Sequence, residues 1–268
     1  MIQAIRSEIL KLRTTRLWWG MAIAIFVAGA LFAGLFAFIY TGETIDPSTG
    51  EPMIDGSATQ IVNSVYTAGL SVGYLLLLTI GVMQVGSEYR HKTITGTFLA
   101  VPRRGRALLA KVVALIGIGA FYGIVSLLGS VSVGATILSM RGVDPFPSTE
   151  ILRSLALSLL ALGLWALIGL GVGILIPNMV AALLVGIGFA WIVEPIVSVA
   201  LSFNDFARDN VVKFLPSQAT NAMVDPVTMS GPGMVEPLSW WVAALVLTAY
   251  ATVLAGLGVL RAAKQDVA

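Results

Sequence analysis

The sequence has no cysteine and one histidine, and only 11% of its 268 residues are charged. Without cysteine there can be no disulfide or thiolate chemistry, and His91 alone cannot complete a zinc site of the Cys and His kind. Soluble domains carry about 25% charged residues. The 16 basic and 14 acidic side chains here are too few to cover the chain with a hydrated shell. The composition therefore predicts an integral membrane protein.

The sequence also lacks the phosphate-binding loop GxxxxGK[ST], since lysine nowhere follows glycine before a serine or threonine. An intramembrane enzyme would need a nucleophile with a base, paired carboxylates or a metal cluster. One histidine and an isolated Glu194 do not supply these. We expect a chain that is not an enzyme and has no cofactor of its own.

Long charge-free stretches set the expected architecture. The residues AVILMFWYC make up 57% of the chain, and one bilayer crossing needs about 20 apolar helical residues. Pro177 and Asn178 divide a long apolar stretch into two crossings, because proline breaks a helix and asparagine tolerates a turn. We expect a single all-α transmembrane domain over residues 1–268, with six membrane helices at 17–40, 62–86, 112–139, 152–176, 179–200 and 239–260.

Basic residues predict the orientation of these helices. Four of them precede the first helix, six lie in the loop after the second, and two lie in the C-terminal tail. The other side of the membrane receives four, and the acidic loop 41–60 has none. By the positive-inside rule both termini are cytoplasmic, in a multi-pass protein of a bacterial-type plasma membrane. The pI of about 9.0 then reflects this rule and anionic membrane lipid, and no nucleic-acid partner is expected.

The first 16 residues predict an amphipathic helix lying on the inner leaflet. The basic residues Arg6 and Arg13 lie opposite an apolar face. The alternative is a frayed tail. The apolar face is formed by residues at three- and four-residue spacing, namely Ile2, Ile5, Ile9 and Leu12.

Small residues four positions apart recur within several predicted crossings. In lipid such pairs let two helix backbones approach closely, so together they predict a compact bundle. The pairs are Gly69 and Gly73, Gly119 and Gly123, and Gly169 and Gly173, together with the series Ser126, Ser130 and Gly134.

The loop from residue 88 to 104 is patterned more strongly than a simple connection. Ile94, Phe98 and Val101 fall on one helical face inside a charged rim, which suits docking into a groove of another protein. The alternating threonines at 93, 95 and 97 argue for a strand instead. The simpler interpretation is a basic loop with a surface helix.

The stretch SEYRHKTITGTFLAVPRRGRALLAKVV, directly after the second predicted helix, resembles the signature of ABC-2 type transporter permeases. In that family an acidic-x-Arg element and a threonine precede a Pro-Arg-Arg turn and a lysine that opens the third helix. Lys92 stands where many members have glycine. The signature positions are held here by Glu88, Arg90, Thr93, Pro102, Arg103 and Lys111.

The resemblance implies a permease that pairs with a second copy or a paralogue and binds separate ABC ATPase subunits, which hold the ATP and Mg²⁺. The pair would export a lipophilic drug, a peptide or a lipid. Residues 88–104 would form the coupling helix that contacts the ATPase. The residues expected to carry this coupling are Glu88, Arg90, Thr93, Ile94, Phe98, Arg103 and Arg104.

Residues 201–238 are too apolar for a solvated loop and too interrupted by charge and proline to span a bilayer. We expect short re-entrant helices on the external side. KFLPSQATNAM is similar to the family's extracellular gate, and a packed cap without a gating role is the alternative. The residues expected at this gate are Phe203, Phe206, Lys213, Phe214 and Pro216, together with Glu194 before it.

Glu194 is the only acidic residue well inside an apolar stretch, about 24 Å along the fifth helix from Asn178. A carboxylate in lipid is costly unless it is paired or wet. One interpretation places it in the exit pathway or the dimer seam, paired with Lys213 or Arg208. The other makes it an interfacial anchor that reaches headgroup water.

Two other functions remain open for this chain. An ion-driven secondary transporter usually has ionisable groups near the membrane midplane and internal repeats. This chain offers one off-centre glutamate and no visible repeat, which makes that function weaker. A membrane anchor that recruits a cytosolic partner through residues 88–104 would use the same docking features without transport.

Overall fold

The computed structural model describes residues 2–42, 57–91, 93, 104–224 and 236–264, and every regular element in these ranges is a helix. The elements are α1 (Ile2–Arg13), α2 (Leu17–Thr41), α3 (Ala58–Thr67), α4 (Leu70–Arg90), α6 (Arg104–Met140), α7 (Glu150–Leu175), α8 (Met179–Gly188), the π-helix η1 (Phe189–Val193), α9 (Glu194–Ser202), α10 (Asp205–Asn210), the 3₁₀ turn η2 (Val212–Phe214), α11 (Pro216–Val224) and α12 (Trp240–Lys264).

Six helical stretches of the described residues are long and apolar enough to cross a membrane, which confirms the predicted number. The second stretch, Ala58–Arg90, begins earlier than predicted because Ser57 and Gln60 form a capping box at its start. α6 also begins earlier, at residue 104 rather than 112. Its 37 residues measure about 55 Å at 1.5 Å per residue, well over the bilayer core. The last residue assigned to the coupling segment therefore belongs to α6.

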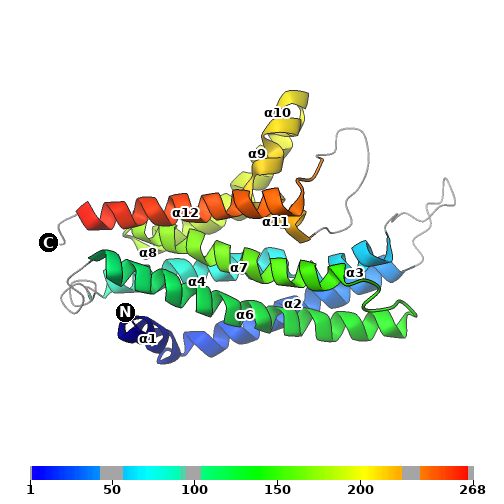
Figure 1. Ribbon diagram of the computed structural model, residues 1–268, viewed down its shortest axis with the longest axis horizontal. Coiled ribbons are helices and arrows are strands. Elements are labelled where there is room, and N and C mark those ends of the chain that lie inside the picture. Colours follow the sequence, from blue (N-terminus) through cyan, green and yellow to red (C-terminus); the bar gives the residue numbers. More distant parts are fainter. Residues whose placement is uncertain (1, 43–56, 92, 94–103, 225–235, 265–268) are drawn as a thin grey trace.

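Five long helices run side by side: α2, α4, α6, α7 and α12 (Figure 1). α1, the C-terminal residues of α4 and the first turns of α6 meet at one end of this bundle, which we call the α1 end. α3 lies at the opposite end, which we call the α3 end.

Glycines set the spacing between the long helices. Gly169 of α7 lies against the backbone of Leu78 in α4, and Gly81 of α4 lies against the backbone carbonyl of Ala166 in α7. A side chain at either glycine would collide with the neighbouring backbone. The close approach predicted from the small-residue spacing is therefore present between these helices.

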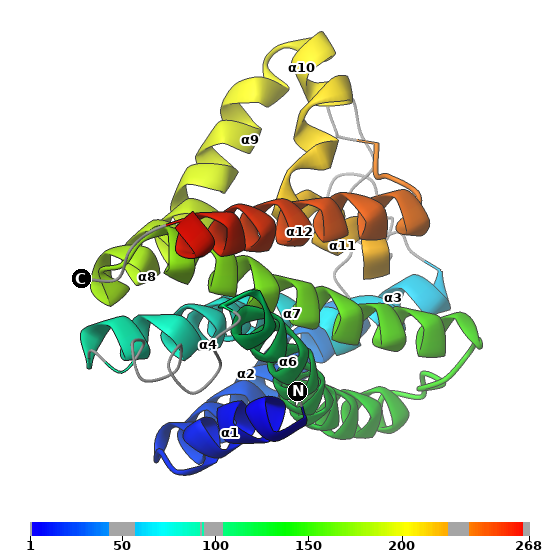
Figure 2. The ribbon, with the colours of Figure 1, turned by 60° about the vertical axis from the view of Figure 1, so that its left-hand side comes forward.

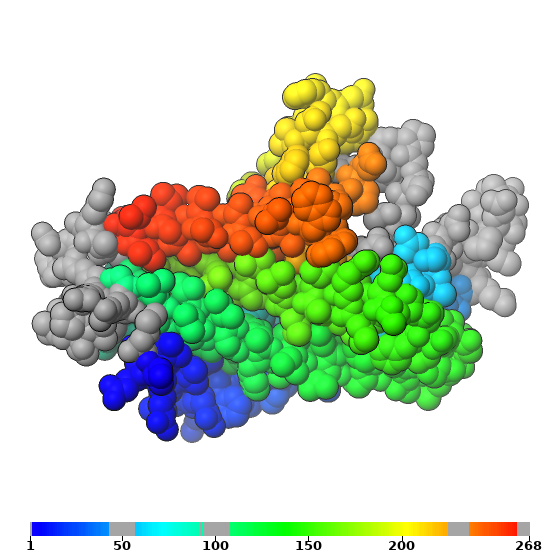
Figure 3. All heavy atoms as spheres, viewed as in Figure 1, coloured from blue at the N-terminus to red at the C-terminus, as the bar shows by residue number. Residues whose placement is uncertain are grey.

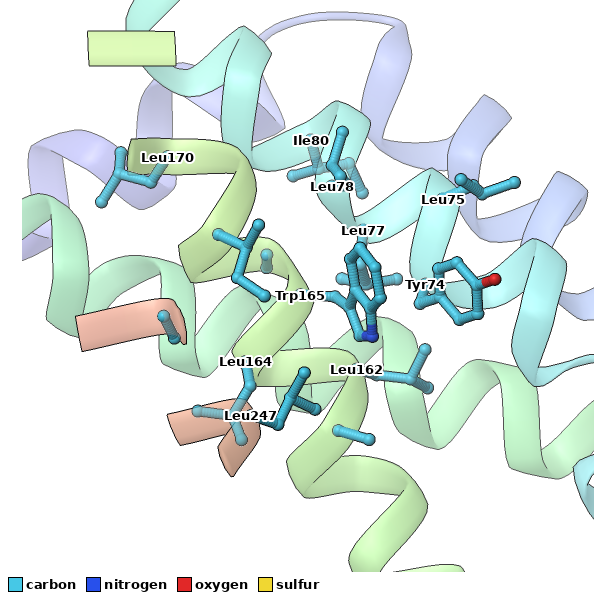
Figure 4. Close-up of a cluster of buried hydrophobic side chains, with 14 of the residues drawn as sticks. Tyr74, Leu75, Leu77, Leu78, Ile80, Leu162, Leu164, Trp165, Leu170 and Leu247 are labelled. Carbon is cyan, nitrogen blue, oxygen red and sulfur yellow. The ribbon is translucent and has the colours of Figure 1, made fainter. Parts of the chain in front are cut away.

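The core between α4 and α7 is centred on two aromatic rings. Tyr74 and Trp165 stack with their centroids 4.3 Å apart and their planes 15° apart (Figure 4). Leu77 and Leu162 pack around the pair, and all four side chains are buried. This core fixes α4 against α7 in the middle of the bundle.

The fifth crossing departs from the bundle. α8 packs against α4, but α9 and α10 stand away from the other helices in both ribbon views and project from the body in the space-filling view (Figures 1, 2 and 3). The chain then returns through η2, and α11 packs against α7 and α12. Short helices follow the fifth crossing as predicted. Their re-entrant insertion stays a prediction, and residues 225–235 of this segment lie outside the described residues.

Candidate functional site

The bundle-facing side of α1 is centred on a carboxylate. Glu8 is 3% exposed, whereas Ile2 and Ile9 of the expected apolar face are 82% and 37% exposed. α1 packs against α2 and α6 at the α1 end. Residues 2–13 are helical, and the position of this helix on the inner leaflet stays a prediction.

Glu8 belongs to an ion network that we call the buried ion network, in which Glu8, Gln84, Glu88 and Lys111 are buried and the side chain of Lys11 is 43% exposed. The Lys111 Nζ lies 2.8 Å from Glu8 Oε2 and 2.7 Å from Glu88 Oε1. The Lys11 Nζ lies 2.7 Å from Glu8 Oε1 and 2.6 Å from Glu88 Oε1. Two carboxylates and two ammonium groups thus balance one another where α1, α4 and α6 meet.

A neutral amide completes one corner of the network. Gln84 donates a hydrogen bond of 3.0 Å to Glu8 Oε2. The Oε2 atom of Glu88 is buried and has no hydrogen-bond partner among the described residues. A buried charge that loses its partner lowers the stability of the folded protein strongly. Removal of one charged member of the network would therefore leave an unpaired charge on another.

The ionised state of the α1 members is favoured by their neighbours. Burial alone would raise the pKa of the Glu8 carboxyl, but the Lys111 and Lys11 ammonium groups outweigh it and lower that pKa. Burial would likewise lower the pKa of Lys11, but Glu8 and Glu88 outweigh it and raise that pKa. Both groups are therefore charged near neutral pH.

The network joins the two helices that flank the coupling segment. Glu88 lies in the last turn of α4, and Lys111 lies two turns into α6. The residues between them include 92 and 94–103, which the structure does not describe.

The predicted coupling residues divide into four groups. Glu88 is buried in the network, where it is bound by Lys11 and Lys111. Arg90 and Thr93 are exposed, and the Thr93 N–H donates to the Glu88 carbonyl at 3.0 Å. Arg104 opens α6. The predicted residues Ile94, Phe98 and Arg103 lie outside the described residues.

Sequence reasoning missed Glu8 as a functional candidate. It lies three residues after Ile5 and four before Leu12, at the spacing of the apolar face. An acidic residue on the apolar face of a helix, close to a membrane surface where basic residues gather, indicates a buried ion pair. Its partner Lys111 could not be identified from sequence spacing, because the two residues are 103 positions apart.

A second candidate site connects the fifth crossing to α11. The Oε1 of Glu194 accepts a 2.6 Å hydrogen bond from the backbone N–H of Ser217, in the first turn of α11. Glu194 is 1% exposed, so it is not an anchor that reaches water. Its Oε2 has no hydrogen-bond partner among the described residues. A carboxylate at this position stabilises the N-terminus of a helix.

α11 is fixed to the core by a second hydrogen bond. The Trp165 Nε1–H donates to the Thr220 hydroxyl at 2.9 Å, and Thr220 donates to the Pro216 carbonyl at 2.7 Å. Pro216 is buried at the start of the helix. α11 is thus bonded to α7 through Trp165 and to α9 through Glu194.

The remaining gate residues lie apart from Glu194. Phe203 and Phe206 are 88% and 74% exposed on the projecting segment, and Lys213 lies 5.7 Å from the Phe214 ring centroid. Arg208 pairs with Asp205 and Asp209. The expected pairing of Glu194 with Lys213 or Arg208 is therefore wrong.

Within the described residues, no three His, Asp or Glu side chains are grouped so that they could hold a metal ion. Among known proteins, residues 4–193 match a family described as ABC-2 family transporter protein. No curated protein matches the chain. The matched range is 190 of 268 residues and ends at Val193, so it includes the whole buried ion network and stops just before Glu194.

Proposed function

The chain belongs to the ABC-2 transporter family, and from this premise we propose that it is the permease subunit of an ATP-driven exporter. Separate ABC ATPase subunits hold the ATP and Mg²⁺, since the chain carries no phosphate-binding loop. The α1 end faces the cytoplasm in this proposal, and the distribution of basic residues supports that orientation. A second copy or a paralogue completes the translocation pathway for a lipophilic drug, a peptide or a lipid.

The observation that carries this proposal is the buried ion network at the base of residues 88–104. An ATPase that binds this segment acts on the C-terminal end of α4 and the N-terminal end of α6. Glu88 and Lys111 join these ends, and Lys11 and Glu8 join both to α1. The three helix ends therefore move as one body, and the motion of the ATPase reaches the bundle instead of being lost in a loose loop.

At the other end of the pathway, we assign α11 the role of an exit gate. Its N-terminus is held by Glu194 and its middle by Trp165. Trp165 stacks on Tyr74 of α4, and the last turn of α4 contains Glu88 of the network. A shift of α4 that follows ATP hydrolysis is transmitted along this rigid helix to the contacts of α11.

The proposal is tested with the permease purified in mild detergent together with the ATPase subunits that accompany it. The complex is reconstituted in vesicles, where ATP hydrolysis and export of a lipophilic dye are measured together. Glu88→Ala and Arg90→Ala should each lower dye export while ATP hydrolysis continues. Glu150→Ala and Arg153→Ala, an exposed acid and base at the α3 end, should change neither rate.

Three results would contradict parts of the proposal. Absence of any ATPase in the purified material rejects an ATP-driven permease. Unchanged export by both coupling variants rejects the assigned coupling residues. An ATPase that binds, while lipophilic compounds neither stimulate it nor cross the vesicle membrane, supports a non-transporting anchor.

A further inference from the structure

A surface cavity of about 270 Å³ lies beside α1, between α1 and the C-terminal half of α4. Its wall includes residues at the limits of three membrane-spanning stretches. Leu17 opens the first, Arg90 closes the second and Met179 opens the fifth. Because these helix ends lie together, we expect the cavity near the boundary of the hydrocarbon region, where the headgroup of a phospholipid meets its acyl chains.

The lining has two chemically distinct parts. Ile80 and Met83, which lie further toward the middle of α4, form an apolar wall together with Met179 at the start of α8. Ser87, Arg90 and His91 form a polar wall at the end of α4. An amphipathic lining of this kind, at this depth, matches a molecule with a polar head and an apolar tail.

The charge of the polar wall favours an anion. Arg90 is exposed and forms no ion pair with any carboxylate of the described residues. Lys11 also lines the cavity, but Glu8 and Glu88 neutralise it. Uncompensated positive charge therefore comes from Arg90, whose guanidinium suits the bidentate binding of a phosphate.

Two helix ends border the same cavity. Met179 opens α8, so the positive end of that helix dipole faces the site, although Asn178 already caps two of its N–H groups. α4 ends at the cavity with the opposite partial charge. The full charge of Arg90 on the last turn of α4 exceeds the half charge of that helix end.

We propose that this cavity binds an anionic phospholipid of the inner leaflet, with its phosphate on Arg90 and an acyl chain along Ile80, Met83 and Met179. The bound lipid lies between α1 and α4 and touches the last turn of α4, next to Glu88 of the ion network. The composition of the inner leaflet can thus influence the position of the coupling segment.

The proposal is tested with the full-length permease in the absence of ATPase subunits, so that its result is independent of the coupling function of Arg90. The protein is stripped of lipid, mixed with phosphatidylglycerol or phosphatidylcholine, and analysed by native mass spectrometry. We expect a severalfold preference for phosphatidylglycerol, because both lipids offer a phosphate but the choline cation of phosphatidylcholine is repelled by Arg90. Arg90→Gln should lose this preference and Arg90→Lys should keep part of it.

The matched control is Arg13→Gln. Arg13 lines a different cavity of about 390 Å³, on the side of α1 that faces α6. This variant should retain the preference for phosphatidylglycerol. Equal losses in Arg13→Gln and Arg90→Gln would overturn the proposal, because they would reflect diffuse attraction to the basic end of the bundle. Displacement of the lipid by equimolar inorganic phosphate would also overturn it, because the site would then bind a free anion.

A second measurement does not depend on any substitution. Phosphatidylglycerol that carries a photoreactive group in its acyl chain is crosslinked to the wild-type permease, and the labelled peptides are sequenced. Label on Met83 or Met179 supports the site. Label spread evenly around the bundle, or confined to Ile118 and Phe121 of the other cavity, overturns it.

Discussion

The ammonium of Lys111 lies 2.8 Å from the carboxylate of Glu8, although 103 residues separate them in the chain. Both side chains are almost completely buried. An amphipathic helix held only by lipid would need no such contact. α1 is therefore bonded to the bundle through charge, and this bond makes the N-terminal helix a part of the coupling machinery proposed for the α1 end.

Lys111→Met should be among the most destabilising single changes at the α1 end. It removes one of two cations and leaves the Glu8 and Glu88 carboxylates buried with only Lys11 to balance them. Breaking a buried ion pair costs about 3–5 kcal/mol. Thermal unfolding in detergent should show a clear drop in midpoint, whereas Glu150→Gln at the α3 end should leave the midpoint unchanged.

The double variant Glu8→Gln with Lys111→Met should be more stable than the sum of the two single losses predicts. Removing both partners leaves one cation and one carboxylate, Lys11 and Glu88, which already contact each other at 2.6 Å. A double-mutant cycle measured by unfolding should give a coupling energy of about 0.5–3 kcal/mol. Strictly additive losses would show that Glu8 and Lys111 do not stabilise each other.

The docking of α1 should depend on pH at both extremes. The pKa of Glu8 is lowered from 4.5, so its contribution is complete above about pH 4.5 and is lost as the pH falls through the lowered value. The pKa of Lys11 is raised from 10.5, so its contribution is complete below about pH 10.5 and is lost as the pH rises through the raised value.

The chain has no cysteine, so a fluorophore on Ser7→Cys reports the position of exposed α1 residues without background labelling. Its signal should be constant between the two limits and change outside them. Adding Glu8→Gln should weaken the acid transition and spare the alkaline one. A signal that titrates near neutral pH would contradict this assignment.

Gly169→Ala should separate α4 from α7, because the added methyl group meets the backbone of Leu78. Overpacking of this kind costs about 1–3 kcal/mol. Gly163→Ala on the same helix is the matched control, since an added methyl group there meets nothing within 4 Å. Thermal unfolding should fall for the first variant and stay equal or rise for the second, in keeping with the helix propensity of alanine.

Glu194→Gln should impair export without loss of folded protein. The amide can still accept the hydrogen bond from the Ser217 N–H, but it removes the charge that stabilises the N-terminus of α11. Dye export from vesicles should fall while thermal stability changes little. Full export by this variant would make the contact structural and remove Glu194 from the proposed gate.

Thr220→Val tests the other attachment of α11. It leaves the buried Trp165 N–H without its acceptor, which costs about 1–3 kcal/mol. We expect both stability and export to fall. Tyr74→Phe leaves the stacked ring in place and is the control, because it does not touch this hydrogen bond.

Much of the architecture could be predicted from local chemistry. The lengths of the charge-free stretches predicted the six crossings. Pro177 and Asn178 predicted the turn between α7 and α8, and the Asn178 side chain caps the N-terminus of α8. The start of α6 was placed too late because its first turns are rich in arginine. Charged residues limit the part of a helix that can lie in lipid, but the helix itself can continue into water.

The sequence by itself determined a membrane-embedded helical bundle. Its charged residues are too few to form a hydrated surface, and in lipid the backbone hydrogen bonds of such a chain are satisfied within helices. Residues 4–193 also match the ABC-2 transporter family. Only the tertiary structure decided which charges face inward. Lys111 forms ion pairs with Glu8 and Glu88, and Glu194 accepts a hydrogen bond from the Ser217 N–H. Pairing between distant helices depends on their packing and leaves no spacing in the chain from which it can be read.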